Sequence, residues 1–299
     1  MTFAAFVLIF LSTFLHVTWN FLSKSTRPSV AFYLLMSSMA ALIWSPFLFL
    51  GGIPFRSLPA SFYLLLFGSV LAEVLYVAGL AYAYRRSEIS LVYPIMRALP
   101  VLMVALLSIA FSLGRQFSLL ALAGMALTTV GCLLMPLRDF HSIHISGGRR
   151  DVLFYIFLGA LGTTFYTLFD SSALKIIAQV AGERTTLQAL GYLFLIEFGL
   201  VLGEIVLVLA IPGELDSLRK LWGHSYAPML AGCCSSSAYG LILLAMTRVD
   251  NVAYIQAFRQ ISLPLGFLAG VFILKETGTM PKFVGLILIT VGLLMTVKG

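Results

Sequence analysis

The chain has 299 residues, of which 60% are hydrophobic and 10% are charged. A water-soluble domain of this length has too little interior to bury so much apolar surface, so the composition excludes a soluble protein and predicts one embedded in a bilayer. The net charge of +7 does not indicate nucleic-acid binding, because most Lys and Arg lie in loops beside apolar runs, where lipid head groups and membrane topology account for them.

Apolar runs long enough to cross a bilayer, at about 20 residues each, recur along the whole chain. Ten runs are predicted to be transmembrane helices, at 3–23, 30–50, 61–84, 90–111, 118–137, 152–178, 187–211, 225–247, 251–274 and 281–297. The loops between them are too short to hold a soluble catalytic domain. The predicted fold class is therefore an all-α polytopic membrane protein with ten transmembrane helices.

The two halves of the sequence resemble each other. GMALTTVGCL (124–133) and GLILITVGLL (285–294) are identical at six positions and lie 161 residues apart. Nearer the start of each half, TFLHVTWNFLSK (13–24) aligns with TFYTLFDSSALK (164–175) at a separation of 151. The separation of 161 also pairs two further positions, Gly79 with Gly240 and Tyr93 with Tyr254.

This ordered series of matches indicates that one five-helix unit occurs twice. The predicted domains are a first repeat at 1–137, a connecting loop at 138–151 and a second repeat at 152–299. Because five is an odd number of crossings, the two repeats are expected to have opposite orientations in the membrane. Inverted repeats are typical of secondary transporters, whose substrate site lies near the bilayer midplane where the repeats meet.

Several stretches together resemble the drug/metabolite transporter superfamily, of the EamA type, over nearly the whole chain. They are HVTWNFLSK (16–24), SEISLVYPIMRALP (87–100), YTLFDSSALK (166–175), AYGLILLAMTRVDNVAYIQAFR (238–259) and the paired G-x-x-L-x-T-V-G segments. The resemblance implies two inverted five-helix repeats around a central cavity that opens alternately to each side of the membrane. It also implies transport of small metabolites, often outward, with protons as a frequent coupling ion.

The resemblance further implies a multi-pass protein of the bacterial inner (plasma) membrane with both termini in the cytoplasm. The distribution of positive charge favours the opposite orientation. Eleven Lys and Arg follow the odd-numbered predicted spans and six lie on the other side. Since loops rich in Lys and Arg stay in the cytoplasm, this count places both termini outside.

Charged residues inside the predicted spans are the candidates for function. Each costs about 2.5–3.5 kcal/mol on insertion scales, so such residues persist where they face a cavity, pair with each other or reach the membrane surface. The candidates are Glu73, Arg97, Asp170, Glu197, Glu204 and Arg259, with His16 as a titratable neighbour.

Arg97 lies inside the fourth predicted span and has three possible roles. It lines a cavity and binds an anionic group, it forms a structural ion pair with Glu73, or it extends to the loop at 85–88. Tyr93 lies one turn before Arg97 on the same helical face. We favour the cavity, because intramembrane ionisable groups are functional by default, and assign Arg97 and Tyr93 to substrate binding.

Arg259 occupies a related place in the ninth predicted span. Gln256 lies on the same helical face as Arg259, and Tyr254 is the counterpart of Tyr93 in the repeat. We interpret this polar patch as cavity lining that binds substrate. Hydrogen bonding between packed helices is the alternative.

A third polar face consists of His16, Trp19 and Asn20, which lie at i, i+3 and i+4 in the first predicted span. Trp19 and Asn20 are predicted to bind a polar or aromatic ligand. The alternative is that they anchor the helix at the membrane–water interface. In the sixth span, Tyr166 and Asp170 form the corresponding polar feature, and Tyr166 is a further candidate for substrate binding.

Four residues are candidates for proton coupling: Glu73, Asp170, His16 and Glu197. Carboxylates and histidines inside membranes form the proton relays of pumps and transporters, and histidine changes charge near physiological pH. Glu197 and Glu204 are seven residues apart on one helical face. For Glu204, a structural contact with a neighbouring helix is the alternative.

Arginines and carboxylates in one bundle can bind both ends of an amino-acid-like molecule. The leading hypothesis is therefore a secondary active transporter, an exporter of a small polar or zwitterionic metabolite. The alternatives are an intramembrane enzyme acting on a lipid or peptide and a non-transporting scaffold. HExxH, GxSxG and GxxxxGK[ST] motifs are absent, so we expect no enzymatic activity and no ATP-driven transport. We expect no cofactor, metal or nucleic acid; the expected partners are the substrate, the bilayer and protons, and the oligomeric state is open.

Overall fold

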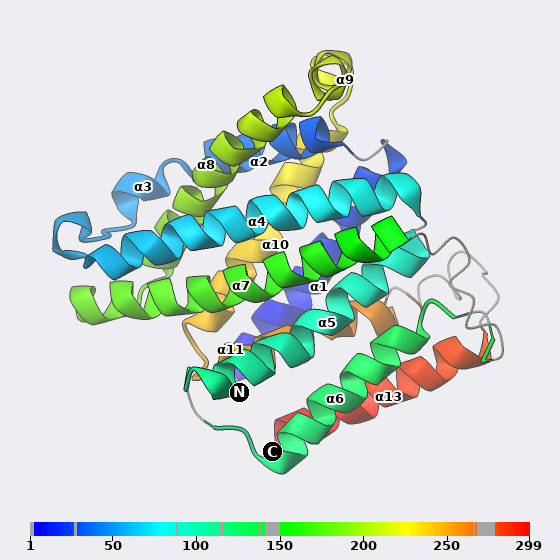
Figure 1. Ribbon diagram of the computed structural model, residues 1–299. Helices are drawn as coiled ribbons and strands as arrows, with labels where there is room; N and C mark the ends of the chain where they lie inside the picture. The colour runs from blue at the N-terminus through cyan, green and yellow to red at the C-terminus, as the bar shows by residue number, and fades with distance from the viewer. Residues whose placement is uncertain are drawn as a thin grey trace.

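A computed structural model describes residues 3–26, 29–87, 89–113, 116–137, 139–140, 150–265, 267 and 279–299. Within these residues every regular element is a helix and there is no strand (Figure 1). The elements are α1 (Phe3–Ser25), α2 (Val30–Trp44), α3 (Phe47–Leu50), η1 (Phe55–Ser57), α4 (Ala60–Arg86), α5 (Ile89–Ala110), α6 (Leu119–Leu134), α7 (Arg150–Ala181), α8 (Thr186–Ala210), α9 (Glu214–Leu221), α10 (Ala227–Met246), α11 (Val252–Phe258), η2 (Arg259–Ile261) and α13 (Met280–Lys298).

Seven of the described helices are long and apolar enough to cross a membrane: α1, α4, α5, α7, α8, α10 and α13. The helices α2 and α6 are also apolar but shorter. The ninth predicted span, 251–274, begins as α11 and η2, and most of its remainder lies outside the described residues. Most of the predicted connecting loop, 138–151, lies outside them too. The chain is an all-helical, multi-pass membrane protein.

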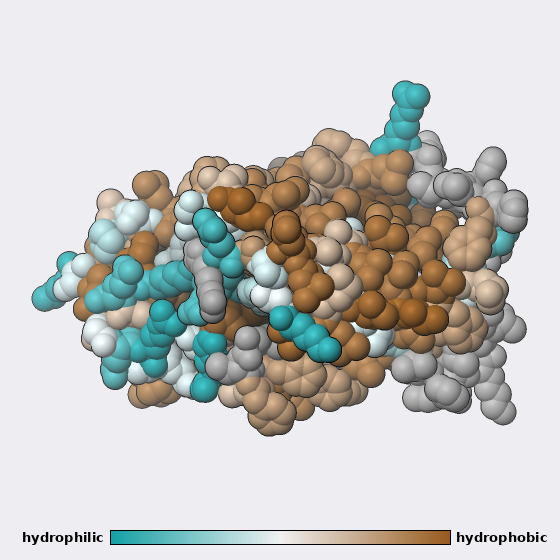
Figure 2. Space-filling view, turned by 90° about the horizontal axis from the view of Figure 1, so that it is seen from below, coloured by the Kyte–Doolittle hydropathy of each residue, from teal (hydrophilic) through white to brown (hydrophobic). Residues whose placement is uncertain are grey.

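The outer surface of the bundle is apolar, as a lipid-facing surface has to be. In Figure 2 apolar side chains cover a broad part of the face that carries α6 and α13, and hydrophilic side chains gather toward one end. On α13, Ile287 is 59% exposed and Leu294 is 58% exposed. Contiguous apolar exposure of this kind would cause a soluble protein to aggregate, whereas hydrocarbon tails cover it at no cost.

Prolines modify two of the predicted spans in different ways. The predicted span 30–50 is interrupted, because α2 ends at Trp44 and α3 begins after Pro46. Pro46 has no backbone N–H to continue the ladder of helical hydrogen bonds. By contrast, α5 continues through both Pro94 and Pro100, and each proline leaves one carbonyl of the preceding turn without its usual helical donor.

The structure contains one helix that the apolar runs did not predict, the short α9 between α8 and α10. It begins after Gly213, whose φ of 83° lies in the left-handed region that glycine adopts without strain. Its first turn carries Glu214 and Asp216 and its last turn carries Arg219 and Lys220. Acidic residues at the start and basic residues at the end favour a helix because they oppose the helix dipole.

Four helix pairs form the main contacts of the bundle: α4 with α7, α1 with α10, α6 with α13 and α2 with α8. Figure 1 shows α4 (cyan) beside α7 (green) and α6 beside α13. In the α6–α13 pair the backbones touch at glycines. A Cβ atom built on Gly124 would lie 2.5 Å from the Gly292 carbonyl oxygen, and one built on Gly131 would lie 2.8 Å from that of Gly285.

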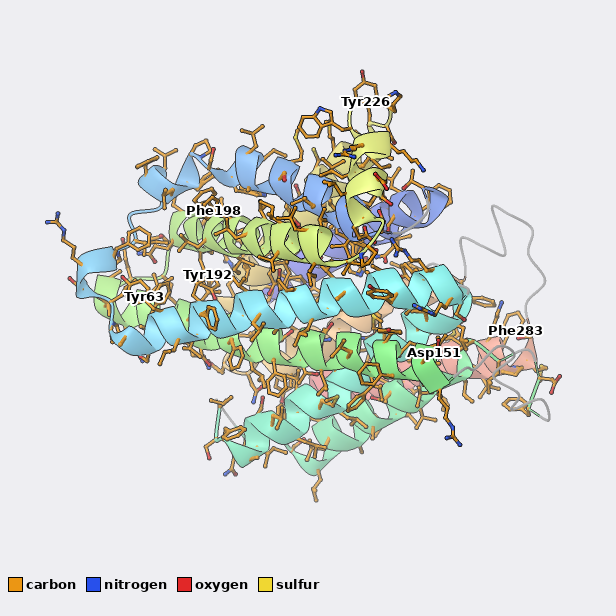
Figure 3. All side chains as sticks on the ribbon, turned by 45° about the horizontal axis from the view of Figure 1, so that its top comes forward. Tyr63, Asp151, Tyr192, Phe198, Tyr226 and Phe283 are labelled. Atoms are coloured by element: carbon orange, nitrogen blue, oxygen red, sulfur yellow. The ribbon has the colours of Figure 1, made fainter. Side chains whose placement is uncertain are left out.

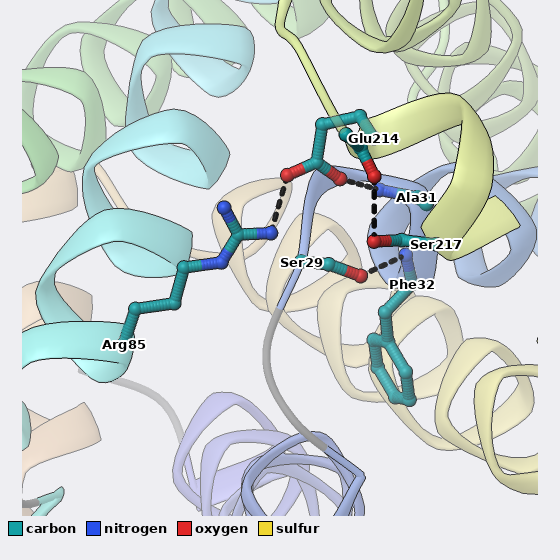
Figure 4. A network of polar contacts seen from close by, with 7 residues as sticks. Ser29, Ala31, Phe32, Arg85, Glu214 and Ser217 are labelled. Carbon is teal, nitrogen blue, oxygen red and sulfur yellow. Dashed lines mark hydrogen bonds and ion pairs between the residues drawn. The ribbon is translucent and has the colours of Figure 1, made fainter.

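A polar contact at one end of the bundle joins α9, α2 and α4 (Figure 4). Glu214 is fully buried, accepts a 2.9 Å hydrogen bond from the backbone N–H of Ala31, and forms an ion pair with Arg85. Beside it, the Ser29 side chain accepts a 3.0 Å bond from the N–H of Phe32. We call Glu214, Arg85 and the Ala31 N–H the Glu214 clasp. It satisfies N–H groups at the start of α2 that have no partner inside the helix.

Candidate functional site

Two adjoining cavities inside the bundle are lined by several of its buried polar and charged side chains. The first has a volume of about 60 Å³ and is lined by Ser12, His16, Trp19, Tyr33, Met36, Ser37, Glu73, Tyr76, Val77, Tyr166, Glu197, Leu200, Ser235, Ala238, Tyr239 and Arg259. The second has a volume of about 20 Å³ and is lined by His16, Tyr76, Leu80, Tyr93, Met96, Arg97, Thr163, Tyr166, Gln256 and Arg259. Four residues line both: His16, Tyr76, Tyr166 and Arg259.

The volume of the two cavities limits which molecules they can hold. Binding sites for small molecules usually enclose about 300–1,000 Å³, whereas a single water molecule needs roughly 10–15 Å³. The first cavity, at about 60 Å³, has room for a few water molecules. In this conformation both cavities are therefore too small for a metabolite, and the residues that line them would have to move apart to admit one.

The Arg97 side chain points into the bundle. Its Nη1 lies 2.8 Å from Nε2 of His16, and its Nη2 donates a 2.5 Å hydrogen bond to the Arg259 carbonyl. The guanidinium also lies over the Tyr93 ring, 5.6 Å from its centre. The backbone carbonyl of Arg97 accepts a 3.1 Å hydrogen bond from Gln260 Nε2. Arg97 thus contacts α1, η2 and its own helix, and forms no ion pair with any described carboxylate, Glu73 included.

The hydrogen bonds around His16 cannot all be satisfied at once. Trp19 Nε1 lies 3.1 Å from His16 Nδ1, and Arg97 Nη1 lies 2.8 Å from His16 Nε2. Indole and guanidinium nitrogens only donate, and a neutral imidazole accepts at only one nitrogen. In one of the two contacts, therefore, the imidazole N–H faces another N–H donor, and no hydrogen bond forms there. The Nε of Arg97 is also buried without a partner. The Arg97 guanidinium therefore retains N–H groups that could donate hydrogen bonds to a ligand.

The second cavity carries positive charge only. Arg97 and Arg259 both line it, and none of the described acidic residues does. Arg259 is buried, and its Nη1 lies 3.4 Å from the side-chain oxygen of Gln256. Gln256 and Arg259, which were predicted to share a helical face, are therefore in contact and line the same cavity. A cavity with two guanidinium groups and no carboxylate has the chemistry to bind an anionic group, because guanidinium matches a carboxylate with two parallel hydrogen bonds.

The first cavity carries the acidic residues. Glu73 and Glu197 both line it, and neither carboxylate forms a hydrogen bond or ion pair with another described residue. Each side chain is largely buried. A buried carboxyl group without a partner is costly in its charged form, so both groups have the chemistry to hold a proton or to meet a cation.

Asp170 has a different environment from the other acids. It is fully buried and accepts hydrogen bonds from Ser69, Tyr192 and Tyr239, the one from Tyr192 at 2.8 Å. Figure 3 shows Tyr192 inside the bundle. The three donors come from α4, α8 and α10, so Asp170 on α7 joins four helices. Only Tyr239 of this group lines the first cavity, and it separates Asp170 from the cavity.

Trp19 and Asn20 lie inside the bundle and do not anchor α1 at the membrane surface. Trp19 is 3% exposed and lines the first cavity. Asn20 is buried, donates to the His16 carbonyl at 2.8 Å and accepts a 3.0 Å bond from the Tyr84 hydroxyl. The Asn20 amide therefore serves to orient α1 against α4, and only Trp19 of the pair reaches the cavity.

The two tyrosines predicted as repeat counterparts have different surroundings. Tyr93 lines the second cavity, and its hydroxyl lies 3.2 Å from that of Ser262. Tyr254 lines neither cavity. Its ring packs against Phe117, with 5.6 Å between the ring centres. Tyr254 is thus a predicted substrate-binding residue that the structure places outside the site, whereas Tyr166 lines both cavities.

Six polar residues of the first cavity were not predicted as site residues from the sequence, among them Tyr33, Ser37 and Tyr239. Tyr33 and Ser37 are one turn apart on α2, so they share a helical face. This spacing of polar groups in an apolar run was a signal that the sequence contained. For Tyr239, the adjacent run of serines and small residues pointed to helix packing instead.

No family model and no curated protein sequence matches the chain. A crystal structure of another protein superposes on it with a TM-score of 0.71, covering 99% of this chain and 96% of the other, at 15% sequence identity. At this identity the likeness establishes the fold alone. Because it extends over nearly the whole length of both chains, the complete helix bundle, and not one part of it, is shared.

Proposed function

We propose that the chain is a secondary active transporter, an exporter of a small polar or zwitterionic metabolite such as an amino-acid-like compound. The observation that carries this proposal is the distribution of charge along the two cavities. Arg97 lines the second cavity, where no described carboxylate lies, Glu73 and Glu197 line the first without an ion pair, and Arg259 lines both. A molecule with an acidic and a basic end complements this arrangement.

The energetics support a ligand over a purely structural role. A structural pair would bring each charge together with its opposite, because an unpaired charge in a membrane costs several kcal/mol. Here none of the four charged side chains forms an ion pair with another, although Arg259 lines the same cavity as Glu73 and Glu197. A zwitterion that places its carboxylate at the arginines and its ammonium group at Glu73 and Glu197 would satisfy all four groups at once.

Helix contacts support an organisation in ten helices as two inverted repeats. The sequence repeat makes α1 the counterpart of α7, and α4 the counterpart of α10. The α4–α7 contact is accordingly repeated by the α10–α1 contact. Gly124 and Gly285 are counterparts, as are Gly131 and Gly292, so the contact of Gly124 with Gly292 is repeated by the contact of their counterparts, Gly285 and Gly131. Such reciprocal contacts are expected of two units related by a two-fold axis.

The proposed organisation assigns the chain to the drug/metabolite transporter superfamily, of the EamA type, in the inner membrane of a bacterium with both termini in the cytoplasm. The N and C marks lie toward the same end of the bundle in Figure 1, which agrees with an even number of crossings. In this proposal Glu73, Glu197 and His16 are the proton-coupling candidates that face a cavity.

A thermal-shift screen of purified protein against amino acids, amines, organic acids, sugars and nucleotides tests the proposal. A ligand at 100 times its Kd stabilises the folded state by about 2.7 kcal/mol. We expect a hit among zwitterions that Arg97→Gln loses, and uptake of the same compound, chemically unchanged, into proteoliposomes. A compound that binds but is altered by the protein, or is never translocated, would contradict the proposal.

A further inference from the structure

Glu204 is a buried acid that neither cavity contains and that the proposed substrate site does not use. It lies on α8, is 0% exposed, and neither of its carboxyl oxygens has a hydrogen-bond partner. The hydroxyl of Ser37 on α2 lies beside it and also has no hydrogen-bond partner. Both unpartnered groups lie where α2 packs on α8.

Glu204 forms no ion pair with any described Lys, Arg or His. The ionisable groups that interact with it are Glu197 on its own helix, Tyr33 on α2 and Glu73 on α4. Within the described part of the chain, no Lys, Arg or His is among them. An ionised carboxylate in such a place would have no counter-ion and at most the Ser37 hydroxyl as a donor, at a cost far above that of the neutral acid. Glu204 therefore holds a proton in this conformation.

The position of Glu204 connects two features already described. Glu197 lies two turns before it on the same face of α8, about 10 Å away, and lines the first cavity. In the other direction α8 ends at Ala210, roughly 9 Å along the helix, and the Glu214 clasp follows. Ser37 lines the first cavity as well. Glu204 thus lies between the cavity and the end of the bundle that carries α9.

We propose that Glu204 is a proton-binding site that controls the α2–α8 interface: it is protonated while these helices are packed and transfers its proton to water when they separate. The proposal extends the proposed transport function, on which it rests, by adding a second proton-binding site that does not contact the substrate. Because the packed form binds one more proton than the open form, raising the pH favours opening. The ratio of open to packed protein then increases up to tenfold for each pH unit.

The first test is infrared spectroscopy of the purified protein, which detects the carbonyl stretch of a protonated carboxylic acid directly. We expect the wild type at neutral pH to show a protonated-acid band whose intensity decreases in Glu204→Gln. The exposed Glu183→Gln is the matched control and should leave the spectrum unchanged. Glu204→Asp is a second variant for the case in which the Gln substitution disturbs the fold. It keeps an acid and should therefore retain the band at a shifted frequency. An identical band in wild type and Glu204→Gln would overturn the proposal.

The second test measures opening of the interface without any substrate. A cysteine at Val208, which is 3% exposed and one turn beyond Glu204, reacts with a maleimide only when α2 and α8 separate. In a background without the three native cysteines, we compare its labelling rate in the protein that retains Glu204 with its rate in the Glu204→Gln variant. The ratio of the first rate to the second cancels the pH dependence of the thiol and should rise up to tenfold per pH unit.

The control for labelling is a cysteine at Val206, which is 64% exposed on the outer face of the same helix. Its rate ratio should stay constant with pH. A constant ratio at Val208 as well would overturn the proposal. Neither test uses a substrate, so a failure of the proposed transport function leaves both results decisive for Glu204.

Discussion

The Glu214 clasp gives the sharpest prediction for stability. Glu214→Ala removes two contacts from a fully buried position, the hydrogen bond from the Ala31 N–H and the ion pair with Arg85. Glu214→Gln keeps an oxygen that can accept from Ala31 but removes the charge that pairs with Arg85. Comparing the two variants therefore separates the contribution of the helix cap from that of the ion pair.

The expected magnitudes follow from the burial of each partner. A hydrogen bond that caps a helix N-terminus contributes about 0.5–2 kcal/mol. Breaking a fully buried ion pair costs about 3–5 kcal/mol, but the Arg85 side chain is 35% exposed, so water compensates part of the loss and about 1–2 kcal/mol remains. Glu214→Ala should thus cost roughly 2–4 kcal/mol and Glu214→Gln about half as much.

Thermal unfolding in detergent, followed by tryptophan fluorescence, measures the effect. At about 2 °C per kcal/mol for a chain of this size, Glu214→Ala should melt roughly 4–8 °C below wild type and Glu214→Gln at an intermediate temperature. Asp216→Asn is the matched control, because its ion pair with Arg219 is exposed, at 68% and 72% for the two side chains. If Glu214→Ala melts at the same temperature as Asp216→Asn, the reasoning is refuted.

Three further variants test the site and the packing. Arg97→Gln should remain folded but lose at least tenfold in transport, since a hydrogen bond to a charged group contributes about 1.5–3 kcal/mol; the exposed Arg56→Gln should transport like wild type, and equal rates for both variants would contradict the assigned role. Asp170→Ala leaves three hydroxyls without their acceptor and should lower the melting temperature more than Asp170→Asn, which keeps one acceptor oxygen. The reverse order of melting temperatures would show that Asp170 does not join the helices. Gly131→Leu forces a side chain against backbone and should cost about 1–3 kcal/mol or more, whereas Val130→Leu on the exposed face should be neutral, and equal melting temperatures would argue against a tight glycine contact.

The long helices could be predicted from the sequence because membrane spans are encoded locally. An apolar run of about 20 residues identifies a span without any tertiary information, and the predicted run 61–84 became α4 at Ala60–Arg86. The break at Pro46 depends on one proline, which some helices accommodate and others do not, as α5 shows. The helix α9 was missed because a search for apolar runs does not register a short amphipathic helix.

The site could be predicted only in part, because its contacts join residues far apart in the chain. Intramembrane charge correctly singled out Arg97 and Glu197 as residues that line the cavities. It did not reveal that Arg97 would contact His16, 81 residues away. Nor could it show that Asp170 would be enclosed by three hydroxyls, since those donors belong to three other helices.

The glycine contacts between α6 and α13 limit how the bundle can move. At both Gly124 and Gly131 the facing backbone leaves no room even for a methyl group, and the two positions are two helical turns apart. Rotating either helix would bring a neighbouring side chain into this space, and sliding would do the same, so neither hinge nor shear motion is available to the pair. The α6–α13 pair is therefore expected to move as one rigid body. Any opening of the cavities has to come from the other helices moving relative to it.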